Sequence, residues 1–179
     1  MSKPIIGVLA LQGAIEPHKA HIEAAGAVFA AVKTAKQFDG VDGFILPDLP
    51  MFEYLETYKP VFDQYGLYNI FLITPQTSEA RIREINDNSH GFIYMVSSAS
   101  TTGARASISA DQSEYFARVK GMNLKNPTLI GFGISNAETF DKACDNANGA
   151  IIGSAFIKAI SQEGELKENI ETFVKSVIG

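Results

Sequence analysis

One cysteine, Cys144, stands among 179 residues, which excludes an internal disulfide and any multi-cysteine metal site. It lies among Asp141, Lys142 and Asp145 in a stretch with a helical pattern, so we expect a residue of ordinary packing rather than a reactive thiol. We expect no cofactor and no bound metal.

The sequence also has no long apolar run and no excess of Lys and Arg over Asp and Glu. No run approaches the roughly 20 apolar residues that cross a bilayer, and the start, Met-Ser-Lys-Pro, has no export segment. We therefore expect no membrane association and a soluble, cytoplasmic protein. A net charge of -5 and a pI near 5.2 argue against a nucleic-acid partner, because binding to phosphate backbones relies on clustered Lys and Arg.

Apolar residues make up 46% of the chain, enough for one well-buried core, and the length predicts a single domain over 1–179. Short β-branched runs alternate with helical patterns, which is typical of an α/β protein with a parallel sheet and flanking helices. Seven strands are expected, at 5–10, 28–32, 43–46, 69–73, 91–96, 128–131 and 150–152.

Several helix starts carry capping chemistry. Ser109 with Gln112 and Ser135 with Glu138 predict capping boxes, and Thr77 or Ser78 is expected to cap the helix that follows. The last helix, 165–178, places four apolar residues on one face and is expected to pack against the sheet: Ile170, Phe173, Val174 and Val177.

Two strands near the C-terminus each end in a glycine-bearing turn that opens a helix. Gly133 follows the first, and Gly153 and Ser154 follow the second. Such turns direct backbone N–H groups and the positive ends of helix dipoles toward an anion, although tight βα turns use glycine for chain reversal as well. The pattern favours a small phosphate or sulfate anion as ligand.

Residues 41–179 resemble the tryptophan synthase alpha subunit, a (β/α)8-barrel lyase that cleaves indole-3-glycerol phosphate to indole and glyceraldehyde 3-phosphate. The matching motifs are Gly-Phe-Ile-Leu-Pro-Asp-Leu-Pro at 43–50, Phe-Ile-Tyr-Met-Val-Ser-Ser-Ala-Ser-Thr-Thr-Gly at 92–103, Gly-Phe-Gly-Ile-Ser at 131–135 and Ile-Ile-Gly-Ser-Ala at 151–155. The resemblance implies a phosphate site at Gly103, Gly133, Gly153 and Ser154.

Residues 1–40 resemble another family, the glutaminase subunit of pyridoxal 5′-phosphate synthase, which has a flavodoxin-like fold. The resemblance rests on Ile-Gly-Val-Leu-Ala-Leu-Gln-Gly-Ala at 6–14 and stops within 39–47, where we expect a seam. A nucleophilic cysteine and a His-x-Glu pair do not follow, so glutamine hydrolysis is not expected.

The alpha-subunit resemblance places the lyase's acid and base on the second barrel strand and the loop after it, a part for which we find no match. We therefore expect an engineered chimera that is not an enzyme and retains only the phosphate site. The alternatives are a residual indole-3-glycerol-phosphate lyase in tryptophan biosynthesis and a module that binds a synthase subunit.

Two residues are weaker site candidates. Asp48 ends the third strand at the edge where parallel sheets bind ligands, but an aspartate that holds the 47–50 turn is the alternative. Tyr94 lies within a strand and either reaches the ligand or fills the core.

The two resemblances together predict a strand order of 2-1-3-4-5-6-7 in an open or incompletely closed barrel, since seven strands are one short of the usual closed barrel. An open edge of apolar strands invites pairing, so a homodimer through that edge is expected.

Overall fold

The structure, a computed structural model, describes residues 5–9, 19–20, 23, 28–34, 43–47, 49–97, 109–131 and 133–179. Its strands are β1 (Ile5–Leu9), β2 (Val28–Val32), β3 (Gly43–Ile45), β4 (Tyr68–Ile70), β5 (Leu72–Ile73), β6 (Ile93–Val96), β7 (Thr128–Gly131) and β8 (Gly149–Ile151). Its longer helical elements are α2 (Met51–Glu53) with the π-helix η2 (Tyr54–Tyr58), α3 (Lys59–Tyr65), α4 (Glu79–Asn88), α5 (Ala110–Gly121), α6 (Ala137–Cys144), α7 (Ser154–Ile160) and α8 (Leu166–Ile178).

All the described strand pairs are parallel. β5, β6, β7 and β8 pair in that order, and β3 pairs with β4. Only Phe71 separates β4 from β5, and its carbonyl accepts a hydrogen bond from the Tyr94 N–H at 2.9 Å, so β3 to β8 form one arc. The α/β class and six of the seven predicted strands are thereby confirmed to within two residues at each end, while the 69–73 strand divides at Phe71.

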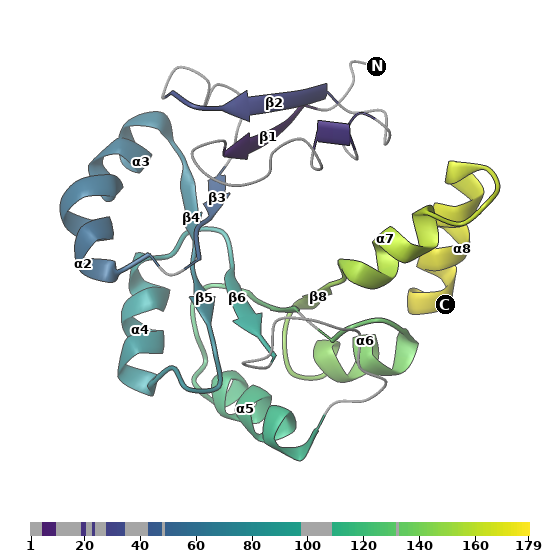
Figure 1. Cartoon of the computed structure of the whole chain (residues 1–179). Coiled ribbons are helices and arrows are strands. Elements are labelled where there is room, and N and C mark those ends of the chain that lie inside the picture. Colours follow the sequence, from purple (N-terminus) through teal and green to yellow (C-terminus); the bar gives the residue numbers. More distant parts are fainter. Residues whose placement is uncertain are drawn as a thin grey trace.

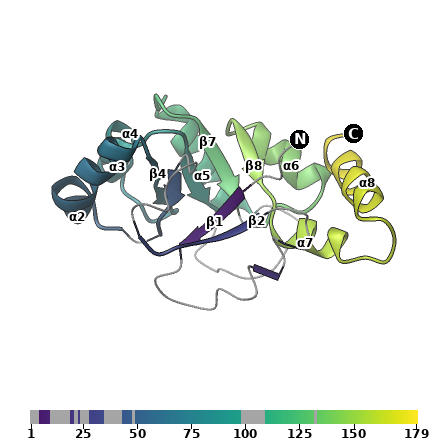
Figure 2. The ribbon, with the colours of Figure 1, turned by 90° about the horizontal axis from the view of Figure 1, so that it is seen from above.

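The arc does not close into a barrel. β1 pairs with β2 over five residues, and within the described part of the chain neither strand pairs with β3 or β8. Figure 1 shows β1 and β2 above β3, with an open side toward α7, and Figure 2 shows the pair between the helices α2 to α4 and the helices α7 and α8. The continuous order 2-1-3-4-5-6-7 is therefore wrong, because β1 and β2 form a sheet of their own, whereas the expected incomplete closure is found.

The core lies between the arc and the helices on its outer side (Figure 1). Ile93 and Met95 alternate along β6 and are fully buried in one cluster with Phe116 of α5 and Ile82 of α4. Since side chains alternate across a strand, Tyr94 between them faces the inner side of the arc.

Local capping follows the predicted chemistry in two helices. Ser109 and Gln112 form the capping box of α5, and the Ser78 hydroxyl accepts from the Arg81 N–H at the start of α4. The last helix differs from the expectation, because α8 packs on α7 and α6 rather than on the sheet, with the rings of Phe156 and Phe173 5.6 Å apart. In the part of the chain that the structure describes, no helix is long and apolar enough to span a membrane.

Candidate functional site

The carboxyl ends of three neighbouring strands lie in one row. The register pairs Val96 of β6 with Gly131 of β7, and Gly131 with Ile151 of β8. The segments that follow these strands therefore leave the sheet side by side, at the edge where parallel α/β proteins bind ligands. Two of the predicted phosphate residues, Gly133 and Gly153, lie on these neighbouring segments.

Ser97 and Gly133 meet at this edge. The buried Ser97 donates its N–H to the Gly131 carbonyl at 3.1 Å, so the pairing of β6 with β7 extends one residue past the strand. Gly133 has φ +81°, in the left-handed region that favours glycine. A methyl group at residue 133 would lie 3.8 Å from the Ser97 hydroxyl, an ordinary contact, so the backbone conformation and not a lack of space calls for glycine there.

Gln112 connects this edge to the start of α5. Its Oε1 accepts from the Ser109 N–H at 2.8 Å, and its Nε2 donates to the Ser97 carbonyl at 3.0 Å. The side chain is buried, so these bonds form away from water, where each is worth more than at the surface. The sequence predicted the first bond, but the second joins residues 15 apart and has no local signature.

The helix after β7 begins one residue later than predicted. Asn136, not Ser135, is the N-cap of α6, and its side chain accepts from the Thr139 N–H at 2.9 Å. The Thr139 hydroxyl accepts in turn from the backbone N–H groups of Ser135 and Asn136. Glu138 instead accepts an ion-pair hydrogen bond from Lys142 on the exposed face of α6, and this lysine lowers the pKa of the Glu138 carboxyl. The Ser135–Glu138 capping box is therefore wrong.

Gly153 and Ser154 open the next helix. Gly153 is the N-cap of α7 and Ser154 its first residue, and no side chain caps this end. Both residues are exposed, and a methyl group at Gly153 would meet nothing within 4 Å. The first N–H groups of α7 are therefore accessible to solvent or to a small anion.

Tyr94 lies on the inner side of the arc, half-buried, beside Gly131. Burial raises the pKa of its phenol above the usual 10.0, so at neutral pH the group is a hydrogen-bond donor with its proton in place. Gly103 and Asp48, the other two predicted site residues, lie outside the described residues. Over the described ranges, no three His, Cys, Asp or Glu side chains come together in a way that would hold a metal ion.

Comparison with known proteins identifies the family. A family model described as "Tryptophan synthase alpha chain" matches residues 24–178. The tryptophan synthase alpha chain of Flavobacterium johnsoniae is 56% identical over 138 residues, which are 77% of this chain and 54% of that protein. The alpha chain of Christiangramia forsetii is 55% identical over 141 residues, 79% of this chain and 54% of that protein. This chain thus spans about half the length of these relatives.

The fold agrees with this family along nearly the whole chain. The tryptophan synthase A-subunit of Pyrococcus furiosus superposes with a TM-score of 0.69 at 26% identity, covering 99% of this chain and 67% of that one. A chain of the tryptophan synthase complex from the same organism superposes with a TM-score of 0.68 at 25% identity, covering 99% of this chain and 66% of that one.

These findings correct the reading of the chain as an engineered chimera. The family model begins at residue 24, inside the segment 1–40 that was expected to derive from a glutaminase, and nothing supports a flavodoxin-like fusion. Relatives of natural origin at 56% and 55% identity also contradict an engineered protein without catalysis. The expectation that the chain is not an enzyme is wrong on the same ground, because these relatives are alpha chains of a synthase. The chain belongs to the tryptophan synthase alpha chain family.

Proposed function

We propose that the chain acts as an alpha chain of tryptophan synthase and cleaves indole-3-glycerol phosphate to indole and glyceraldehyde 3-phosphate. The observation that carries the proposal is the common edge at which β6, β7 and β8 end, where the register aligns Val96, Gly131 and Ile151. A substrate held there meets backbone N–H groups after β7 and β8 and the Tyr94 phenol from the inner side of the arc.

The substrate's phosphate is proposed to bind at Gly103, Gly133, Gly153 and Ser154. The start of α7 supports this, because no side chain caps its backbone N–H groups. The left-handed Gly133 supports it as a turn at the same edge of the sheet. Titration with inorganic phosphate, followed by amide chemical shifts, should move Gly133, Gly153 and Ser154. Ser154→Asp should weaken the binding through charge repulsion, whereas Ser161→Asp at the far end of α7 should not. Unmoved amides at millimolar phosphate would contradict the site.

The cleavage needs one proton removed and one delivered. Asp48, which follows β3, is proposed to take the proton of the glycerol hydroxyl. The bond between that carbon and the indole ring then breaks, the aldehyde forms, and the electron pair left on the ring takes up a proton. Tyr94 is proposed to deliver it, since its raised pKa keeps the phenol protonated at neutral pH. The proton held by Asp48 then returns to Tyr94 through solvent, which balances the reaction.

Release of indole from indole-3-glycerol phosphate tests the chemistry. Asp48→Asn and Tyr94→Phe should each lower kcat by about 100-fold or more, the range in which positioned acids and bases contribute. Tyr68→Phe, an exposed tyrosine at the start of β4, is the matched control and should leave the rate unchanged. Wild-type protein that releases no indole would overturn the lyase proposal.

Association is the second part of the proposal. Large apolar side chains are exposed along α2, η2 and α3, and they are Phe52, Leu55, Tyr58, Val61 and Tyr65. An exposed apolar set of this kind marks a contact surface. We infer that the chain assembles with the beta subunit of the synthase, or with a second copy through the open edge of the arc. Size-exclusion chromatography with and without the beta subunit separates the two, and a monomer in both runs would contradict association.

A further inference from the structure

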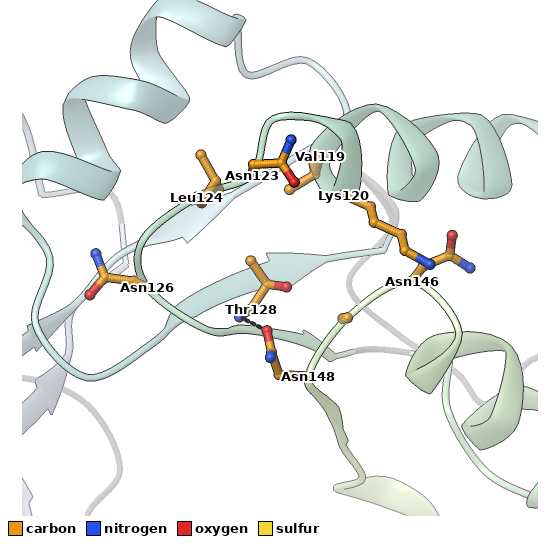
Figure 3. Close-up of a pocket in the computed structure, with 9 residues that line it drawn as sticks. Val119, Lys120, Asn123, Leu124, Asn126, Thr128, Asn146 and Asn148 are labelled. Atoms are coloured by element: carbon orange, nitrogen blue, oxygen red, sulfur yellow. Dashed lines mark hydrogen bonds between the residues drawn. The ribbon is translucent and has the colours of Figure 1, made fainter.

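A polar cavity of about 240 Å³ lies at the other end of the sheet from the candidate site, where β7 and β8 begin. The end of α5 and the turn after it form one wall, and the first residue of β7 and the turn between α6 and β8 form the other. Figure 3 shows Asn123 and Leu124 on one side of this space, with Thr128 and Asn148 across from them.

Two asparagines at helix ends line this cavity. The Nδ2 of Asn123 donates to the Gly121 carbonyl at 3.2 Å, and the Nδ2 of Asn146 donates to the Lys142 carbonyl at 3.0 Å. One N–H of each amide is thus bonded at a helix end. The amide oxygen of Asn123 is left to accept a hydrogen bond from a ligand.

Two further side chains contribute donors. The Oδ1 of Asn148 accepts from the Thr128 N–H at 2.9 Å, which leaves the Asn148 amide N–H groups for a ligand (Figure 3). The ammonium of Lys120 donates to the Asp145 carbonyl at 2.6 Å and has further N–H groups beyond that bond. The cavity therefore combines acceptors with donors at short range.

The charges at the cavity select against ions of either sign. The Lys120 ammonium disfavours a cation. The carboxyl ends of α5, at Gly121, and of α6, at Cys144, both adjoin the cavity, and their partial negative charge disfavours an anion. The cavity therefore favours a ligand without net charge that both donates and accepts hydrogen bonds.

We propose that this cavity binds a small neutral polyol of monosaccharide size. Hydroxyl groups both donate and accept, which matches this mixture of acceptors and donors, and the side chains of Val119, Leu124 and Ala147 give the carbon skeleton an apolar contact. The volume equals that of about eight water molecules in the liquid. The site is separate from the proposed phosphate site, which lies at the carboxyl ends of the strands.

Titration of the whole chain with D-glucose, followed by backbone and side-chain amide shifts, tests the proposal. The amides of Asn123, Asn146 and Asn148 should shift and saturate, while those of Gly133 and Gly153 should not move. Parallel titrations with sulfate and with tetramethylammonium should leave the three asparagines unchanged. Shifts that never saturate, or saturation by either ion, would overturn the proposal, and neither result bears on the lyase reaction.

Two variants place the binding in the cavity. Ala147→Leu fills it and should raise the glucose dissociation constant about tenfold or more, whereas Ala80→Leu on the exposed face of α4 should not. Asn123 has φ +50°, so Asn123→Gly removes the amide without backbone strain and should also weaken binding. Unchanged affinity in Asn123→Gly, or in folded Ala147→Leu, contradicts the site.

Discussion

The ring of Tyr94 lies against the backbone of Gly131 on the inner side of the arc, so closely that a methyl group at residue 131 would overlap the Tyr94 hydroxyl and ring carbons. The two residues belong to neighbouring strands, β6 and β7. Because Gly131 has no side chain, the Tyr94 ring occupies the space in front of it. The position of the Tyr94 phenol therefore depends on glycine at residue 131.

Gly131→Ala should destabilise the fold by about 1–3 kcal/mol, the usual cost of overpacking. In a Tyr94→Leu background the same change should cost clearly less, since the ring that it displaces is gone. Urea unfolding of the four proteins of this cycle measures the coupling. Gly121→Ala is the control, because a methyl group there meets nothing within 4 Å. Additive effects in the cycle would mean that the two residues do not share the space.

Local sequence chemistry predicted much of the framework. The runs 28–32 and 128–131 have the bounds of β2 and β7, because apolar β-branched residues there are bordered by turn formers. Ser109 was predicted as an N-cap together with its Gln112 partner, since a capping box is decided within four residues. The strand positions alone also predicted that Gly133 and Gly153 follow strands that end at the same edge of the sheet.

What the sequence left undetermined depends on partners far along the chain. Ser135 and Asn136 have the same capping chemistry, and only the backbone conformation selects Asn136. The break at Phe71 and the closeness of Tyr94 to Gly131 are properties of neighbouring strands. The expected glutaminase origin of the first 40 residues was wrong, because short strand and helix patterns are shared by many α/β proteins, and 99% of the chain superposes on an alpha chain.

Gln112→Leu should destabilise the protein by about 1–3 kcal/mol, because the Ser97 carbonyl loses its donor and the Ser109 N–H loses its acceptor at a buried position. Gln64→Leu, at an exposed position of α3, is the matched control. Urea unfolding measures both. Equal effects in the two variants would show that the buried bonds contribute no net stability.

Tyr115 should make the protein sensitive to alkaline pH. Burial raises the pKa of its phenol above the usual 10.0, partly offset by Arg118, so the folded state keeps a proton that the unfolded state loses. This contribution is fully present below pH 10 and is lost as the pH rises from there toward the folded pKa, by up to about 1.4 kcal/mol per pH unit. Unfolding free energies between pH 8 and 11 measure the slope.

The variant Tyr115→Phe should flatten that slope. At pH 7 it should leave stability unchanged or higher, because the buried Tyr115 hydroxyl finds no hydrogen-bond partner among the described residues. Tyr58→Phe, at an exposed position, controls for the loss of a phenol. If the slope is the same in Tyr115→Phe and in the wild type, groups other than Tyr115 cause the loss of stability at alkaline pH.

Asn69 should be a position where an apolar residue stabilises the fold. Its side chain in β4 is fully buried, and neither amide atom has a hydrogen-bond partner within the described part of the chain. A buried amide without partners costs about 1–3 kcal/mol in proteins, and Asn69→Leu removes that cost while adding apolar contact. Urea unfolding should therefore shift to higher concentration for Asn69→Leu. Asn69→Asp, which places a charge at the same position, should shift it to lower concentration. If Asn69→Leu destabilises the protein instead, the prediction is wrong, and the Asn69 amide has a hydrogen-bond partner such as an ordered water.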